Sequence, residues 1–111
     1  MQFDDTHIYQ RSLELMEVTR RVLDQLPTGF GFLAEQLRKA SSSILLNFAE
    51  GYGRRTKKDQ RHFFDMSRGS TNEVAAILDV AAGLGGIDRE LQAQGRELCD
   101  HIARMLTRFR R

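Results

Sequence analysis

The sequence predicts an all-α fold, a single up-and-down antiparallel four-helix bundle that occupies residues 1–111. Apolar residues recur every three or four positions along four stretches, which is the spacing of amphipathic helices. Short segments rich in glycine or proline separate these stretches, and such segments interrupt helices. Connections this short place each helix antiparallel to the one before it, and a chain of 111 residues is the size of one domain.

The first expected helix spans about residues 6–26, with Asp5 or Thr6 able to cap its start and Pro27 following its end. Its apolar side chains spread over more than half of the helix circumference, whereas packing into one bundle core needs a stripe of about 100–140°. The excess predicts a second buried face on this helix. The apolar residues concerned are Ile8, Tyr9, Leu13, Leu15, Met16, Val18, Val22, Leu23 and Leu26.

The second expected helix spans about residues 32–50, after a connection formed by residues 27–31. Gly51 is expected to adopt the left-handed conformation that often ends a helix. Leu46 lies opposite the apolar stripe and is weak support for a partner surface, because single exposed leucines are common. The expected stripe consists of Leu33, Leu37, Ala40, Ile44 and Phe48.

The third expected helix spans about residues 56–84, with Thr56 as its cap and Asp59 at the capping-box position. Its expected core residues are Phe63, Ser67, Ser70, Val74, Ile77, Leu78 and Ala81. The fourth helix is expected to follow Asp88, which can cap it. Its apolar stripe consists of Leu91, Leu98, Cys99, Ile102, Met105, Leu106 and Phe109.

Small and polar residues lie where the second and third helices are expected to face each other. The helices are antiparallel around a turn near residue 55, so facing positions have numbers that sum to roughly 110. This rule places Ser43 opposite Ser67, and a buried Asn47 can bond across the helices and fix their register. We interpret these residues as a polar seam that sets helix pairing, in preference to a catalytic or ligand site. The seam comprises Gln36, Ser43, Asn47, Glu50, Arg54, Ser67, Ser70 and Glu73, with Glu50 within reach of Arg54.

The net charge is only +2, but basic residues concentrate in two zones. Residues 54–68 and 104–111 each carry a net charge of +4, whereas residues 1–53 carry −2 and residues 69–103 carry −4. Basic patches bind phosphates by charge without reading sequence, and Tyr52 is placed to stack on a base. The alternative is a solvated basic face that binds nothing. The predicted nucleic-acid contacts are Arg55, Lys57, Lys58, Arg61, Arg68, Arg104 and Arg108, and the second zone also contains Arg110 and Arg111.

A long spaced pattern in the middle of the chain resembles the signature of one protein family. The residues that carry it are Gln36, Leu37, Arg38, Ala40, Ser43, Ile44, Asn47, Ala49, Glu50, Gly51, Gly53, Arg54, Phe63, Ser67, Gly69, Ser70 and Glu73. The pattern is similar to that of the "four helix bundle protein" family, which includes proteins encoded in intervening sequences of bacterial large-subunit rRNA genes. It is similar to accessory proteins of diversity-generating retroelements as well. The resemblance implies an up-and-down bundle, a ring-shaped homo-oligomer with the pentamer as its expected form, and, in the retroelement branch, nucleic-acid binding.

Motifs for catalysis are missing from the sequence, which has no phosphate loop, no serine elbow and no Glu-x-x-His metal motif. We therefore expect no enzyme, no metal and no cofactor, and we expect the single Cys99 to be a core residue. No apolar run approaches the ~20 residues of a membrane span, and the acidic N-terminus lacks an export signal. These features predict a cytoplasmic protein without membrane contact. The alternative to nucleic-acid binding is a protein-interaction scaffold with no nucleic-acid role.

Overall fold

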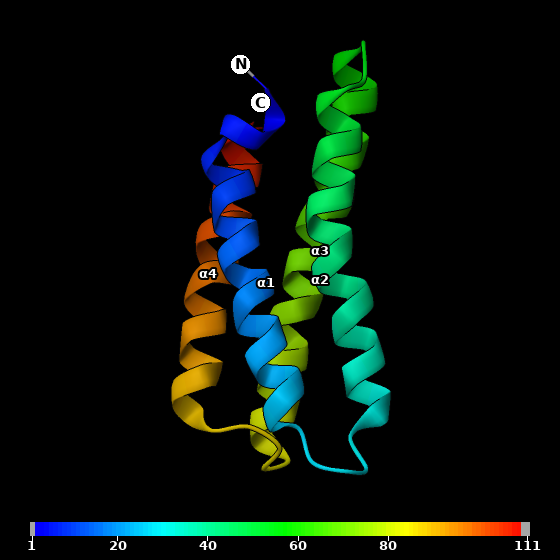
Figure 1. The fold of residues 1–111 in the computed structure, drawn as a ribbon. Coiled ribbons are helices and arrows are strands. Elements are labelled where there is room, and N and C mark those ends of the chain that lie inside the picture. Colours follow the sequence, from blue (N-terminus) through cyan, green and yellow to red (C-terminus); the bar gives the residue numbers. More distant parts are fainter. Residues whose placement is uncertain (1, 110–111) are drawn as a thin grey trace.

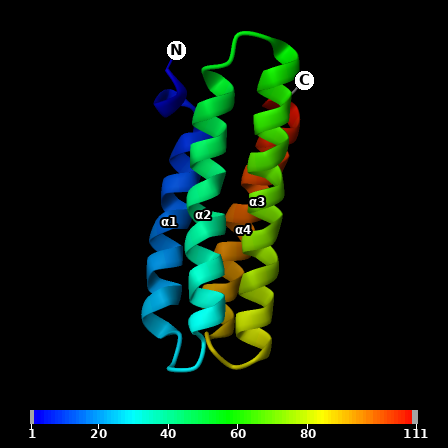
Figure 2. The same cartoon turned by 90° about the vertical axis from the view of Figure 1, so that its right-hand side faces the viewer.

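The computed structural model describes residues 2–109, apart from the side chain of Asp5. A short 3₁₀ turn, η1 (Phe3–Asp5), precedes four α-helices, which are α1 (His7–Gln25), α2 (Gly31–Tyr52), α3 (Lys57–Gly83) and α4 (Arg89–Phe109). The helices run up and down in a rod of 44 × 22 × 18 Å, and each packs on the next, with α4 closing the bundle against α1 (Figures 1 and 2). The predicted four-helix fold is confirmed.

Side-chain caps begin three of the helices, as predicted. The Thr6 hydroxyl accepts a hydrogen bond from the Tyr9 backbone N–H at 3.1 Å, and the Thr56 hydroxyl accepts one from the Asp59 N–H at 3.1 Å. Asp88 caps α4 in the same way. Each cap satisfies a backbone donor that has no partner within its own helix, so the sequence fixes where these helices begin.

The prediction that Gly51 ends α2 in a left-handed conformation is wrong. The helix continues through Gly51 to Tyr52, and Gly51 is buried. Positive φ angles occur instead at Gly29 (103°) and Gly85 (80°), in the two connections at the opposite end of the bundle (Figure 1). Gly51 therefore serves close packing between helices and not backbone freedom.

The core follows the predicted stripe on α2, where all five residues are less than 5% exposed. On α4, Cys99 is buried as predicted, whereas Leu98 and Phe109 lie at the edge of the stripe and are only partly covered. Gly95 is also buried, and α4 packs so closely there that a Cβ would collide with the side chain of Leu78. The apolar pattern gives no signal for Gly95, which has no side chain to contribute to it.

The predicted core face of α3 is wrong at two positions. Phe64 and Thr71 are buried, whereas Phe63 and Ser70 are only half-buried. Two adjacent phenylalanines lie three and four residues before Ser67, and both spacings are compatible with one helix face. Phe64 takes the central position because α3 packs on α4 as well as on α2, which leaves Phe63 on the flank that faces α2.

The second apolar face of α1 is not covered within a single chain. Leu13 is 43% exposed, and Tyr9, Met16 and Leu23 are only half-buried. Leu46 on α2 is 68% exposed. The broad apolar arc predicted for α1 is therefore present as a surface feature.

Candidate nucleic-acid interface and polar seam

The antiparallel topology brings both basic zones to one end of the bundle. The turn between α2 and α3 and the C-terminal end of α4 lie at the same end of the rod, far apart in sequence (Figures 1 and 2). All seven predicted contact residues are exposed, and we call this group the basic end: Arg55, Lys57, Lys58, Arg61, Arg68, Arg104 and Arg108. Arg110 and Arg111 lie outside the described residues.

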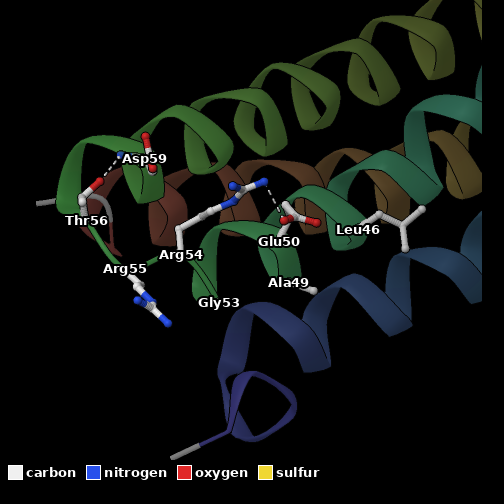
Figure 3. Close-up of a pocket in the computed structure, with 8 residues that line it drawn as sticks. All are labelled: Leu46, Ala49, Glu50, Gly53, Arg54, Arg55, Thr56 and Asp59. Carbon is white, nitrogen blue, oxygen red and sulfur yellow. Dashed lines mark hydrogen bonds and ion pairs between the residues drawn. The ribbon is translucent and has the colours of Figure 1, made fainter.

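A hollow at the tip of the α2–α3 hairpin contains one compensated arginine. The Arg54 guanidinium lies 2.8 Å from the Glu50 carboxylate (Figure 3). It also lies 4.6 Å from the centroid of the Phe63 ring. Its backbone carbonyl accepts a hydrogen bond from the Gln60 side chain at 3.0 Å. The predicted Glu50–Arg54 pair is thus confirmed, while Arg55 points away from it (Figure 3). The hollow is lined by Leu46, Ala49, Glu50, Gly53, Arg54, Arg55, Thr56 and Asp59.

A second hollow lies between α3 and α4 and links the two basic zones. Lys57, Arg61 and Arg68 recur along α3 at spacings of four and seven residues, so they share one face of the helix. Thr107, which lines this hollow from α4, lies between Arg104 and Arg108 in sequence. We call this feature the α3–α4 hollow, and its lining residues are Asp65, Arg68, Gly69, Asn72 and Thr107.

Hydrogen bonds connect part of the predicted polar seam. The Ser70 hydroxyl donates to the Ser43 hydroxyl at 2.9 Å, and the buried Ser67 hydroxyl donates to the Ile44 carbonyl at 2.6 Å. The Asn47 amide donates to the Ser43 hydroxyl at 2.8 Å. The two serine bonds join α2 to α3, and the Asn47 bond holds the Ser43 hydroxyl from within α2, so these hydroxyls have partners where water is excluded.

The predicted register of the seam needs correction. Ser43 bonds to Ser70 and not to Ser67, and Asn47 bonds within its own helix and not across to α3. Helical side chains tilt toward the N-terminus of their helix. The side chains of α2 therefore tilt away from the α2–α3 turn, whereas those of α3 tilt toward it. As a result, the α3 side chain that meets a given α2 side chain belongs to a residue later in α3 than the one at the same height along the bundle.

Two predicted seam residues lie outside the bonded network. Gln36 and Glu73 are both exposed, and between residues 2 and 109 neither is joined to the serine hydroxyls. Both residues lie on the outer side of the interface between α2 and α3, where water can solvate them. The seam is therefore shorter than predicted.

An aromatic cluster closes the bundle beneath the basic end. Tyr52, which was expected to offer its ring to a base, is half-buried, with ring centroids 6.0 Å from Phe48 and 6.1 Å from Phe109. Phe109 also contacts the Phe64 ring at 5.2 Å. Tyr52 is therefore a packing residue that helps to fix the end of α4 against the α2–α3 hairpin.

Comparison with known families identifies the chain. A family model described as "23S rRNA-intervening sequence protein" matches residues 4–108. The chain belongs to this family. The match spans all four helices, the polar seam and every described residue of the basic end, so the resemblance seen in the sequence is confirmed. The comparison with individually curated proteins gave no match.

Within this family member, the single cysteine is a structural residue. Cys99 is 2% exposed, and burial raises the pKa of its thiol to about 12. A thiol that keeps its proton is a poor nucleophile and a poor metal ligand. In the part of the chain that the structure describes, no group of three or more His, Cys, Asp and Glu side chains is arranged to hold a metal ion.

The helices of this family member differ from membrane spans. None of those between residues 2 and 109 combines the length and the hydropathy that a bilayer crossing requires. Charged residues recur on the outer face of every helix, as expected for a bundle whose polar faces meet water.

Proposed function

We propose that this chain is a non-enzymatic, homo-oligomeric bundle protein that binds RNA or DNA through phosphate contacts at its basic end. One observation supports this function above all: the basic residues of 54–68 and those of 104–109, at the end of α4, flank the same end of the rod. Like charges gathered in one place repel each other, and a polyanion relieves this repulsion. Phosphate contacts of this kind bind without sequence preference.

The location of the charged pairs also supports the proposal. Arg54 has an intramolecular partner in Glu50, and Arg96 pairs with Asp79 further along the bundle. The exposed Lys57 and Lys58 occupy the first turn of α3, where the helix dipole disfavours positive charge. Two lysines at a helix N-terminus contribute nothing to helix stability, so a binding role accounts for them better.

Removal of four basic residues tests the proposal. Changing Arg55, Lys57, Lys58 and Arg61 together to Gln should leave the fold intact and weaken binding to RNA and DNA of unrelated sequences. The slope of log affinity against log salt should become shallower by about 0.7–0.9 for each phosphate group that the variant no longer neutralises. Arg54 stays unchanged because it pairs with Glu50.

The matched control removes four basic residues elsewhere, by changing Arg21, Arg38, Lys39 and Arg89 to Gln. Arg21 lies near the end of α1, Arg38 and Lys39 lie in the first half of α2, and Arg89 begins α4, so all four are away from the α2–α3 turn. The change in net charge is the same. The control should retain binding. Absence of wild-type binding near 50 mM salt, or equal binding by both variants, would contradict nucleic-acid binding at this end.

The homo-oligomeric part of the proposal draws on the exposed apolar surface. Leu13 on α1 and Leu46 on α2 are 43% and 68% exposed, and monomers seldom leave a broad apolar helix face uncovered. A five-membered ring is the form that the family resemblance implies. The same surface favours the second candidate function, a scaffold that binds another protein. Capture of a protein partner by this chain that does not weaken as the salt concentration rises, together with no binding of this chain to RNA, would favour the scaffold.

A further inference from the structure

Gly69 lies in the middle of α3 without a packing reason for its missing side chain. A Cβ built on Gly69 would meet no heavy atom within 4 Å, and positive φ angles among the described glycines belong only to Gly29 and Gly85. Glycine inside a helix is less stable than alanine because it loses more backbone entropy on folding. The fold of the single chain therefore does not explain Gly69, and the open space beside it lets another molecule approach the helix backbone closely.

The space over Gly69 opens into the α3–α4 hollow, whose lining is chemically mixed. Arg68 and Asn72 supply N–H donors, and Asp65 supplies a carboxylate. Thr107 donates its hydroxyl hydrogen to the Ala103 carbonyl at 3.0 Å, which leaves the lone pairs of its oxygen as acceptors. A hollow that holds donors for an anion next to acceptors for a hydroxyl fits a ligand with both groups.

We infer that the α3–α4 hollow is a subsite for one ribose-phosphate unit of an RNA chain. In this subsite Arg68 and Asn72 bind the phosphate, and Asp65 accepts a hydrogen bond from the 2′-hydroxyl. Gly69 lets the sugar-phosphate backbone approach the helix. The inference rests on the proposed nucleic-acid binding and adds a preference for RNA to it.

The chemistry of each residue suits its role. An arginine guanidinium matches the geometry of phosphate oxygens, and an amide adds a further donor. A carboxylate repels phosphate but accepts hydrogen bonds from hydroxyls. Its two oxygens accept about four such bonds, so Asp65 can bind a sugar hydroxyl in addition to its contacts within the protein. The 2′-hydroxyl is the group by which a protein distinguishes RNA from DNA.

The position of Asp65 makes the subsite specific. Asp65 lies four residues after Arg61 and three before Arg68, so it shares a helix face with two predicted phosphate contacts. A carboxylate on this face repels every polyanion, whatever its contacts within the protein. A hydrogen bond from the 2′-hydroxyl, present in RNA only, offsets this repulsion for RNA and not for DNA.

The first experiment measures affinity for three single strands of one sequence, in RNA, DNA and 2′-O-methyl RNA, at a fixed low salt concentration. The wild type should bind RNA about 5-fold more tightly than either of the other strands, which lack the donor hydroxyl. Asp65→Ala should bring the three affinities together. Asp59→Ala removes the same charge from the same helix but from the hollow at the tip of the α2–α3 hairpin, so it should preserve the preference for RNA.

The second experiment uses Gly69→Ala, which should raise the melting temperature because alanine is the better helix former. The same variant should lose affinity for RNA by about 5-fold, and its oligomeric mass should stay unchanged. Gly83→Ala is the control, since Gly83 is another helical glycine of α3 with open space around its Cβ position but lies at the far end of the helix. It should bind RNA like the wild type.

The outcomes separate the subsite from the proposed function. Absence of binding to any strand overturns nucleic-acid binding, and the subsite with it. Equal affinity of the wild type for RNA and DNA overturns the subsite alone. An equal gain in affinity for RNA and DNA in Asp65→Ala does so as well, because Asp65 then acts only through its charge. A change of oligomeric mass in Gly69→Ala also overturns the subsite, since it assigns Gly69 to a contact between subunits.

Discussion

Gly51 of α2 lies directly against the ring of Phe64 on α3. A Cβ built on Gly51 would come within 2.7 Å of Phe64 Cε1 and within 2.9 Å of Phe63 Cβ, distances that would force the two helices apart. The contact lies at the C-terminal end of α2, where the α2 backbone packs directly against both phenylalanines of α3. The glycine matters because it has no side chain, and its φ is an ordinary helical one.

Replacement of this glycine should therefore destabilise the bundle. We expect Gly51→Ala to lower the free energy of unfolding by about 1–3 kcal/mol, because overpacking displaces backbone and ring atoms. Gly53→Ala is the matched control, since a Cβ at Gly53 would have its nearest neighbour at 3.7 Å and its φ of −85° suits alanine. Urea denaturation measures both, and equal stabilities for the two variants would contradict the close contact.

Two buried serines distinguish bonds between helices from bonds within one helix. The Ser67 hydroxyl donates to the Ile44 carbonyl across the seam, whereas the Ser41 hydroxyl donates to the Leu37 carbonyl of its own helix. Ser67→Ala should lower the free energy of unfolding by about 1 kcal/mol, and Ser41→Ala should cost less, because alanine is the better helix former. Thermal melts that rank the two variants in the opposite order would argue against a seam that sets helix pairing.

The buried thiol predicts how stability depends on pH in alkaline solution. Burial raises the pKa of Cys99 from its ordinary 9.0 to about 12, so the unfolded chain loses this proton at a lower pH than the native protein. Stability is therefore fully present below about pH 9 and falls as pH rises toward 12, by up to about 1.4 kcal/mol per pH unit.

Comparison with Cys99→Ala isolates this effect from the other groups that titrate at high pH. Between about pH 9 and pH 11, the wild type should lose up to about 2 kcal/mol more stability than the variant. The measurement is the free energy of unfolding in urea at each pH. Parallel curves for the two proteins would show that Cys99 is no more protected in the native state than in the unfolded chain.

The exposed apolar surface predicts self-association. Light scattering at micromolar concentration should give a mass several times that of one 12.7 kDa chain. The double variant Leu13→Asp, Leu46→Asp should lower this mass because charges are costly to bury without partners. Leu84→Asp is the control, since Leu84 is 60% exposed in the α3–α4 connection at the opposite end from the basic end. A wild-type mass of one chain would refute the prediction.

Local signals in the sequence predict most of the fold. Thr6, Thr56 and Asp88 predict the helix starts because a capping bond depends only on residues within one turn. The α2 stripe is predicted fully because its apolar residues have a single consistent spacing. The choice between Phe63 and Phe64 is not predicted, because both suit the helix period and only packing against a third helix decides between them.

The candidate site was less predictable because it depends on distances between helices. The basic residues are evident in sequence, and an up-and-down topology implies that both zones share one end. The partner of Ser43 is not evident, since a shift of one helical turn between α2 and α3 leaves every helix-level pattern unchanged. The α3–α4 hollow is hidden for the same reason, because Thr107 is far in sequence from the α3 residues beside it.

The basic end lies at one end of the long axis of the rod, which has a consequence for a symmetric assembly of several copies. The rod is 44 Å long, several times the Debye length of about 8 Å at physiological salt, so its two ends act on a polyanion independently. Rotation about one axis preserves any charge asymmetry along that axis, whatever the number of copies. In a ring whose axis runs along the helices, every copy presents its basic end on the same rim, so one rim attracts a polyanion and the other does not.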